Sequence, residues 1–135
     1  MWQCPKCKRE FIKPNQSHSC VSFPIENHFK NKEAVARLLF DALVNEIEHS
    51  IGLVKIESLP CCIHLVSDYT FGAVWAMKDK IRIDFRISRK LDDPRISKQE
   101  KLSANRFLYY IDLESREDID GQLIDWIKES YFLKN

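Results

Sequence analysis

The stretch Ile81-Arg82-Ile83-Asp84-Phe85-Arg86-Ile87-Ser88 alternates apolar and polar residues along its whole length. Successive side chains of a β-strand point to opposite faces, so this alternation predicts a strand with one face in a hydrophobic core and the other in solvent. The apolar residues share the buried face. Arg82 and Arg86 must then share the opposite face.

Shorter strand-like runs lie on both sides of this stretch. We predict five strands, over residues 53–57, 61–66, 71–77, 81–88 and 106–113. Lys78-Asp79-Lys80 has the composition of a tight turn between two of them. Residues 89–105 are polar and irregular, and we predict no strand there. Consecutive strands joined by short turns are typical of an antiparallel sheet.

Two helices are expected to cover the sheet. From about Lys32 to Ser50, apolar residues recur at the spacing of one helix face, and Gly52 follows where a helix commonly ends. The predicted buried positions are Val35, Leu38, Leu39, Ala42, Leu43 and Ile47. A second helix begins at the capping box Ser115-Arg116-Glu117-Asp118. The predicted fold class is therefore α+β, an antiparallel sheet of about five strands packed against two main helices.

Residues 1–22 lack the apolar content to fold alone and carry the ligand spacing of a metal site. Cys4 and Cys7 form a Cys-x-x-Cys motif, and His18 and Cys20 follow after ten residues. Structural zinc is held by four such ligands in a tetrahedron, and its binding supplies folding energy. We predict a structural zinc bound by Cys4, Cys7, His18 and Cys20. The predicted division is a zinc-binding segment, 1–22, and an α+β domain, 23–135.

Two other interpretations of the Cys-x-x-Cys motif are less well supported. A thioredoxin-like redox motif lies at a strand-to-helix junction, and an iron–sulfur site usually takes four thiolates. Cys61, Cys62 and His64 form a second group, in which a Cys–His pair is typical of a thiol nucleophile. Because their neighbours are apolar, we interpret them as buried core residues that are neither ligands nor catalytic.

The composition excludes several classes of protein. An apolar fraction of 44% is normal for a globular chain, and no apolar run approaches the roughly 20 residues that cross a bilayer. Met1 is not followed by the basic and apolar regions of a signal peptide. We therefore expect a cytoplasmic protein, away from membranes, whose five cysteines are ligands or free thiols.

Charge is distributed unevenly, although the net charge is only +1. Residues 78–106 hold ten lysines and arginines against five acids, whereas residues 112–135 hold seven acids against three bases. Arg82 and Arg86 therefore have two interpretations. They can contact phosphates of a nucleic acid, or they can pair with the acidic segment of the same chain. Lys6, Lys8 and Arg9 can likewise contact an anionic partner or stabilise the zinc thiolates.

The chain resembles a bacterial family catalogued as domain of unknown function 5655. The resemblance rests on four stretches: Trp2-x-Cys4-Pro5-Lys6-Cys7, residues 15–20, Phe71-Gly72-Ala73-Val74, and Asp118-Ile119-Asp120 leading to Trp126. A more distant similarity to small frataxin-like iron-chaperone domains implies a helix, an antiparallel sheet and a terminal helix. Iron binding is not implied, because Asp41, Glu46 and Glu48 are too scattered to form an acidic ridge.

Two classes of function remain. The sequence holds no glycine-rich phosphate loop, nucleophile elbow or His-Glu-x-x-His motif, so it does not predict an enzyme. The first class is a non-enzymatic binding module for nucleic acid or another anionic partner, which uses Arg82, Arg86 and the basic N-terminal residues. The alternative is a small-molecule-binding or enzymatic domain with a pocket between sheet and helices.

Overall fold

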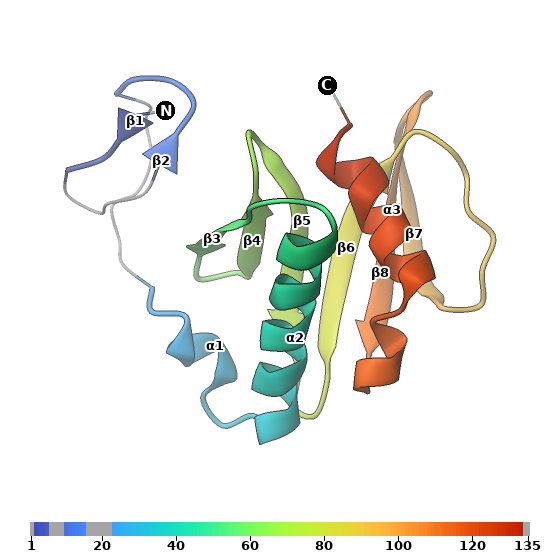
Figure 1. Ribbon diagram of the computed structural model, residues 1–135, viewed down its shortest axis with the longest axis horizontal. Coiled ribbons are helices and arrows are strands. Elements are labelled where there is room, and N and C mark those ends of the chain that lie inside the picture. The colour runs from blue at the N-terminus through green and yellow to red at the C-terminus, as the bar shows by residue number, and fades with distance from the viewer. Residues whose placement is uncertain (1, 6–9, 16–22, 134–135) are drawn as a thin grey trace.

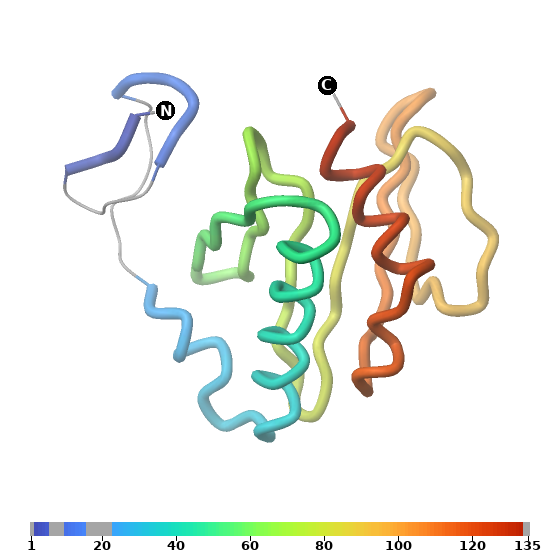
Figure 2. The backbone as a smooth tube through the Cα atoms, in the orientation of Figure 1, coloured from blue at the N-terminus to red at the C-terminus, as the bar shows by residue number. Residues whose placement is uncertain are grey.

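The computed structural model describes residues 2–5, 10–15 and 23–133, and a six-stranded sheet is their main feature (Figures 1 and 2). Its strands are β3 (Lys55–Ser58), β4 (Ile63–Val66), β5 (Thr70–Ala76), β6 (Ile81–Ile87), β7 (Ile96–Ser103) and β8 (Arg106–Leu113). They lie in the order β3-β4-β5-β6-β8-β7, with every neighbouring pair antiparallel. The predicted α+β class and antiparallel sheet are thus confirmed.

Strand β6 lies inside the sheet and has the predicted alternation. Four of its side chains are fully buried: Ile81, Ile83, Phe85 and Ile87. The Phe85 ring stacks on Trp126 with centroids 6.0 Å apart, and it lies 6.1 Å from Tyr109 on β8. The alternation of residues 81–87 therefore does set which face of the sheet is buried.

The predicted number of strands was wrong, because β7 lies within residues 89–105. All of its residues after Ile96 are exposed, and its sequence is mostly polar on both faces. It is the edge strand, and it joins β8 through a tight turn in which Ser103 lies opposite Arg106. Backbone pairing with β8 forms this strand, so it carries no apolar alternation that a sequence pattern could detect. The other five strands begin and end within two residues of the predicted bounds.

Helices cover one face of the sheet. They are the short α1 (Glu26–Phe29), α2 (Ala34–Ser50), the 3₁₀ helix η1 (Arg116–Asp118) and α3 (Gly121–Tyr131). Figure 1 shows α2 and α3 side by side on the same face of the sheet. Their buried side chains join those of β4, β5, β6 and β8 in one hydrophobic core. No helix in the described part of the chain is both long and apolar enough to cross a membrane.

Two details of the predicted helices need correction. Leu38 was expected in the core but is 66% exposed, because the buried stripe of α2 runs through Ala36, Phe40 and Leu43 instead. The capping box at Ser115 is present, but it caps η1. Helix α3 begins only at Gly121, where the Asp120 carboxylate accepts a hydrogen bond from Leu123 N at 2.9 Å.

A buried serine of α3 joins two strands. Ser130 is 1% exposed; its hydroxyl donates to the Phe71 carbonyl at 2.6 Å and accepts from Arg86 N at 3.0 Å. The side chain therefore bridges β5 and β6 just beyond Gly72 and Phe85, the last residues that those strands pair. It satisfies two backbone groups that the sheet itself leaves open.

The described N-terminal residues form a small two-stranded sheet of β1 (Trp2–Gln3) and β2 (Glu10–Phe11). The rings of Trp2 and Phe11 face each other across it, with centroids 5.9 Å apart. Glu10 forms an ion pair of 2.7 Å with Lys55 on β3. This ion pair connects the N-terminal segment to the edge of the main sheet.

Candidate functional site

The face of the sheet opposite α2 and α3 carries the polar residues that alternate with the core. We call it the helix-free face, since no helix of the described residues packs on it (Figure 1). It contains His64, Ala73, Trp75, Arg82, Asp84, Arg86, Leu108, Tyr110 and Asp112. One row crosses four strands, because His64 lies opposite Ala73, Ala73 opposite Asp84, and Asp84 opposite Tyr110.

Arg82 and Arg86 share this face as predicted, but Arg82 already has an anionic partner. Its Nε lies 2.6 Å from Asp112 Oδ1, and its Nη2 lies 3.2 Å from Asp112 Oδ2. Lys80 Nζ reaches the same carboxylate at 3.2 Å. Hydrogen bonding by Arg82, together with Lys80, lowers the pKa of Asp112. For Arg82 the ion-pair interpretation of the basic residues is therefore confirmed.

The same interpretation is confirmed for two further arginines that follow β6. Arg89 forms a two-pronged ion pair with Glu129 of α3, at 2.9 and 2.7 Å. Arg95 Nη1 lies 3.0 Å from the carboxylate of Asp120, the N-cap of α3. Part of the charge asymmetry between residues 78–106 and 112–135 is thus paired within the fold.

Arg86 differs from these arginines. Its side chain is exposed, and within the described ranges its guanidinium makes neither an ion pair nor a side-chain hydrogen bond. Its charge nevertheless acts on its neighbours. Burial is the main reason why the pKa of His64 is lowered, and Arg86 lowers it further. Arg86 is therefore an exposed cation on the helix-free face with no ion-pair partner among the described residues.

Aromatic rings lie on the same face. Trp75 and Tyr110 are half-buried, and their ring centroids are 5.7 Å apart at an interplanar angle of 43°. Lys98 Nζ lies 5.4 Å from the centroid of the Tyr110 ring, within the range of a cation–π contact. Two partly exposed π surfaces therefore lie among cationic side chains.

Asp84 is the acidic residue at the centre of the helix-free face. Burial raises the pKa of this carboxyl to about 6, against the opposing effects of the hydrogen bond from Ala73 N and the charge of Arg86. A Cβ on Gly72 would lie 2.9 Å from the Asp84 carbonyl oxygen, so the two strands pack too closely there for a larger residue.

The sequence-based interpretation of Cys61, Cys62 and His64 as buried core residues is confirmed for Cys62 and wrong for the other two. Cys62 is buried, but Cys61 is exposed and His64 is half-buried on the helix-free face. Their potential ligand atoms all lie within 4.8 Å of one another, so the group could hold a metal ion. Burial is the main cause that raises the pKa of Cys62 to about 12, which argues against a nucleophilic thiol at neutral pH.

Residues 25–134 match the family model described as Domain of unknown function (DUF5655). The chain belongs to the DUF5655 family. No curated protein and no solved structure matches it. The DUF5655 match includes the whole helix-free face and the group Cys61, Cys62 and His64. It excludes the N-terminal residues that hold the predicted zinc ligands.

The N-terminal segment ahead of the DUF5655 domain is only partly described. Of the four predicted zinc ligands, Cys4 is described, and it is 3% exposed. Three ligands, Cys7, His18 and Cys20, lie outside the described residues, as do the basic residues Lys6, Lys8 and Arg9.

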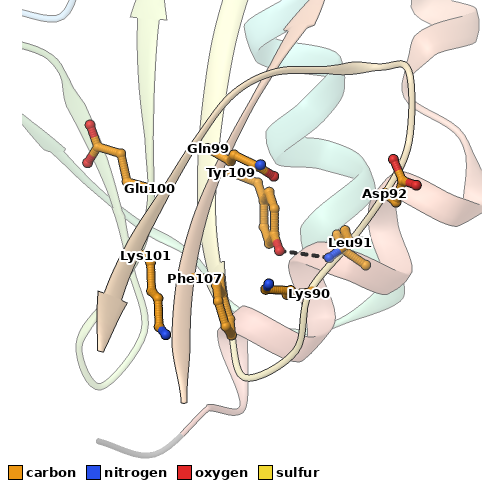
Figure 3. Close-up of a pocket in the computed structure, with 8 residues that line it drawn as sticks. All are labelled: Lys90, Leu91, Asp92, Gln99, Glu100, Lys101, Phe107 and Tyr109. Atoms are coloured by element: carbon orange, nitrogen blue, oxygen red, sulfur yellow. Dashed lines mark hydrogen bonds between the residues drawn. The ribbon is translucent and has the colours of Figure 1, made fainter. Parts of the chain in front are cut away.

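The DUF5655 domain also has a cavity of about 460 Å³ between the loop after β6 and the strands β7 and β8 (Figure 3). It is lined by Lys90, Leu91, Asp92, Gln99, Glu100, Lys101, Phe107 and Tyr109. The Tyr109 hydroxyl accepts a hydrogen bond from Leu91 N at 2.7 Å and so holds the loop. The cavity lies at the edge of the sheet, whereas the alternative function predicted from the sequence has its pocket between sheet and helices.

Proposed function

We propose that this DUF5655 protein is a non-enzymatic binding module whose helix-free face binds single-stranded nucleic acid. The observation that carries the proposal is the exposed guanidinium of Arg86, which has no ion-pair partner in the part of the chain that the structure describes and lies on the same sheet face as the rings of Trp75 and Tyr110. A sheet face with these two features can hold a phosphate and stack bases at the same time. Arg82 supports the face through Asp112 and is not the main phosphate contact.

The chemistry of this face predicts weak binding with little sequence preference. Each base stacked on an aromatic ring contributes about 1–3 kcal/mol, whichever base it is. Several cations of this face are already paired within the described residues: Arg82 and Lys80 with Asp112, and Lys98 with Glu100 at 3.2 Å. We expect Lys6, Lys8 and Arg9 to add phosphate contacts from the N-terminal segment. The affinity then falls in the range of non-specific binding, about 10⁻⁴ to 10⁻⁶ M.

Reversing the charge of Arg86 tests where the nucleic acid binds. Arg86→Glu should weaken binding of a single-stranded oligonucleotide at least tenfold at ~50 mM salt, since it replaces a phosphate contact by a repelling charge. It should also reduce the slope of log K against log salt concentration by about 1. Fluorescence anisotropy titrations at several salt concentrations give both quantities.

Lys128→Glu is the matched control, because it changes the net charge equally at an exposed residue of α3, on the helix-covered side of the sheet. It should leave the affinity within about twofold of the wild type, as expected for a distant, screened charge. Equal losses in the two variants would show that net charge drives binding, and the helix-free face would then have no special role.

A structural zinc in the N-terminal segment is the second part of the proposal. Cys4, Cys7, His18 and Cys20 supply three thiolates and one imidazole, and a cytoplasmic location would keep the thiols reduced. The buried position of Cys4 and the packing of Trp2 on Phe11 support an ordered centre there. The bases Lys6, Lys8 and Arg9 would also stabilise the thiolates.

Cys4→Ser should remove one equivalent of zinc per chain from the protein as purified. Without Cys4 the site keeps three ligands and is open to water, and the segment loses part of the folding energy that a closed site supplies, so the metal should be bound too weakly to survive purification. Metal analysis of the purified wild type and variant measures the difference. Unchanged zinc content in the variant would show that Cys4 is not a ligand.

The cavity of Figure 3 favours the alternative, a small-molecule-binding or enzymatic domain. Its buried hydroxyl, that of Tyr109, is already bonded to the loop. All four of its charged lining residues are exposed: Lys90, Asp92, Glu100 and Lys101. Ligand sites usually present polar groups that converge on the ligand. The helix-free face is therefore the better candidate for the binding site.

A further inference from the structure

We infer that Cys61, Cys62 and His64 form a second metal site, which binds a borderline-soft cation such as Zn²⁺ through two thiolates and one imidazole. The site lies within the DUF5655 domain and is separate from the proposed N-terminal zinc site. It does not depend on whether the helix-free face binds nucleic acid.

A turn in the backbone brings the three ligands together. Adjacent residues of an extended chain point in opposite directions, so Cys61 and Cys62 could not share a metal on a regular strand. Here the chain bends between β3 and β4, and Leu59 N donates to the Cys62 carbonyl at 3.0 Å. The bend turns both thiols to the same side. His64 then follows Cys62 at the spacing of two residues that share a strand face.

The distances between the ligand atoms suit a metal ion. The Cys61 and Cys62 sulfurs are 3.1 Å apart, and all three ligand atoms lie within 4.8 Å of one another. In tetrahedral zinc sites, bond lengths of about 2.3 Å to sulfur and 2.0 Å to nitrogen separate the ligand atoms by about 3.5–3.8 Å. The two sulfurs are somewhat closer than zinc would hold them, and no pair of the three ligand atoms is more than 4.8 Å apart. Side-chain rotation alone can therefore close the three ligands around one ion.

The ligand set selects the class of metal. Thiolates favour zinc and monovalent copper, imidazole also suits zinc, and neither suits magnesium or calcium. Three protein ligands leave a fourth position for water or another ligand. Cys61 is exposed and Cys62 is 4% exposed, so an ion can enter from the side of Cys61 and be held against the sheet.

His64 has a carboxylate neighbour, Glu57, as metal-binding histidines commonly do. Glu57 on β3 lies opposite His64 on β4, on the same face of the sheet, and its charge acts on the imidazole. Such carboxylates orient the ring and strengthen it as a ligand. Glu57 is thus a positioning residue for His64.

The experiment uses the full-length chain, kept under a reductant that does not bind metal. After removal of metal with a chelator, Zn²⁺ is titrated back in competition with a chromogenic chelator. The wild type should bind one equivalent more than Cys61→Ser/Cys62→Ser. Cys4→Ser should lose a different equivalent and keep this one. If the double variant binds as much zinc as the wild type with the same affinity, the inference is wrong.

A variant that replaces only one ligand keeps the test valid if the double variant fails to fold. His64→Ala should lower the affinity of this equivalent at least tenfold, because changing only an outer-shell partner already costs 10–100-fold. His49→Ala, an exposed histidine of α2, should leave it unchanged. Wild-type affinity in His64→Ala would exclude the imidazole and overturn the site as proposed.

Protection of the thiols gives an independent measurement on the wild type. Added Zn²⁺ should slow the alkylation of Cys61 by iodoacetamide at least tenfold, measured on the separate peptides by mass spectrometry. His64→Ala should remove most of this protection and leave that of Cys4 intact. An alkylation rate of Cys61 that does not respond to Zn²⁺ contradicts the inference.

Discussion

Ser130→Ala is expected to lower the free energy of unfolding by about 2–4 kcal/mol. The hydroxyl bridges the Phe71 carbonyl and the Arg86 N–H, and the side chain is 1% exposed. Without it, both backbone groups remain in the interior with no hydrogen-bond partner. Each such loss costs about 1–3 kcal/mol. The penalty is large because one small side chain completes the pairing of β5 with β6.

Urea denaturation at neutral pH measures this loss. Ser88→Ala is the control, because it removes the same hydroxyl from an exposed position just after β6. A surface substitution of this kind should change the free energy by no more than about 0.5 kcal/mol. If Ser130→Ala is as mild as the control, the hydroxyl bridge does not hold the two strands together.

Asp84→Asn is expected to raise the free energy of unfolding at pH 7 by about 2–3 kcal/mol. Burial raises the pKa of this carboxyl from 3.8 to about 6 in the folded protein, so its ionisation opposes folding. A difference of about two pKa units corresponds to about 3 kcal/mol. Asparagine stays neutral, and its oxygen can still accept the hydrogen bond from Ala73 N.

The free energy of unfolding should depend on pH in a direction that the raised pKa of Asp84 determines. Between pH 3.8 and about 6 the folded state binds more protons at Asp84 than the unfolded state, so the contribution of this residue to stability falls as the pH rises. The advantage of Asp84→Asn over the wild type should be near zero at pH 3.5 and complete above pH 6.5. Asp125→Asn, at an exposed position of α3, should show no such difference.

Unfolding curves of the wild type and both variants across this pH range test the prediction. Groups that titrate equally in all three proteins cancel in the comparison. A constant difference between Asp84→Asn and the wild type from pH 3.5 to pH 7 would show that the folded protein does not raise the pKa of Asp84.

The sequence predicted those helices and strands that have one buried face and one exposed face. Residues 81–87 alternate because β6 separates the core from the helix-free face, and the stripe of α2 is apolar for the same reason. Strand β7 was missed, because it lies at the sheet edge and forms through backbone pairing with β8. A periodic apolar pattern arises only in an element that buries one face, and every residue of β7 after Ile96 is exposed.

The candidate site was predicted only in part. Alternation correctly placed Arg82 and Arg86 on one face, and charge distribution raised the possibility of ion pairs with the acidic segment. The distinction between the two arginines depends on the register of β6 with β8, which sets Arg82 opposite Asp112. The grouping of Cys61 with Cys62 and His64 depends on the turn between β3 and β4, which the alternation of a strand does not reveal.

The most direct test of the account is a fluorescence anisotropy titration of wild-type protein into a labelled single-stranded oligonucleotide at ~50 mM salt. Binding through Arg86 and the rings of Trp75 and Tyr110 predicts saturation with a dissociation constant of about 1–100 μM, and the affinity should fall steeply as salt is added. If the protein binds neither single-stranded DNA nor single-stranded RNA at tens of micromolar protein, the result contradicts the proposed function.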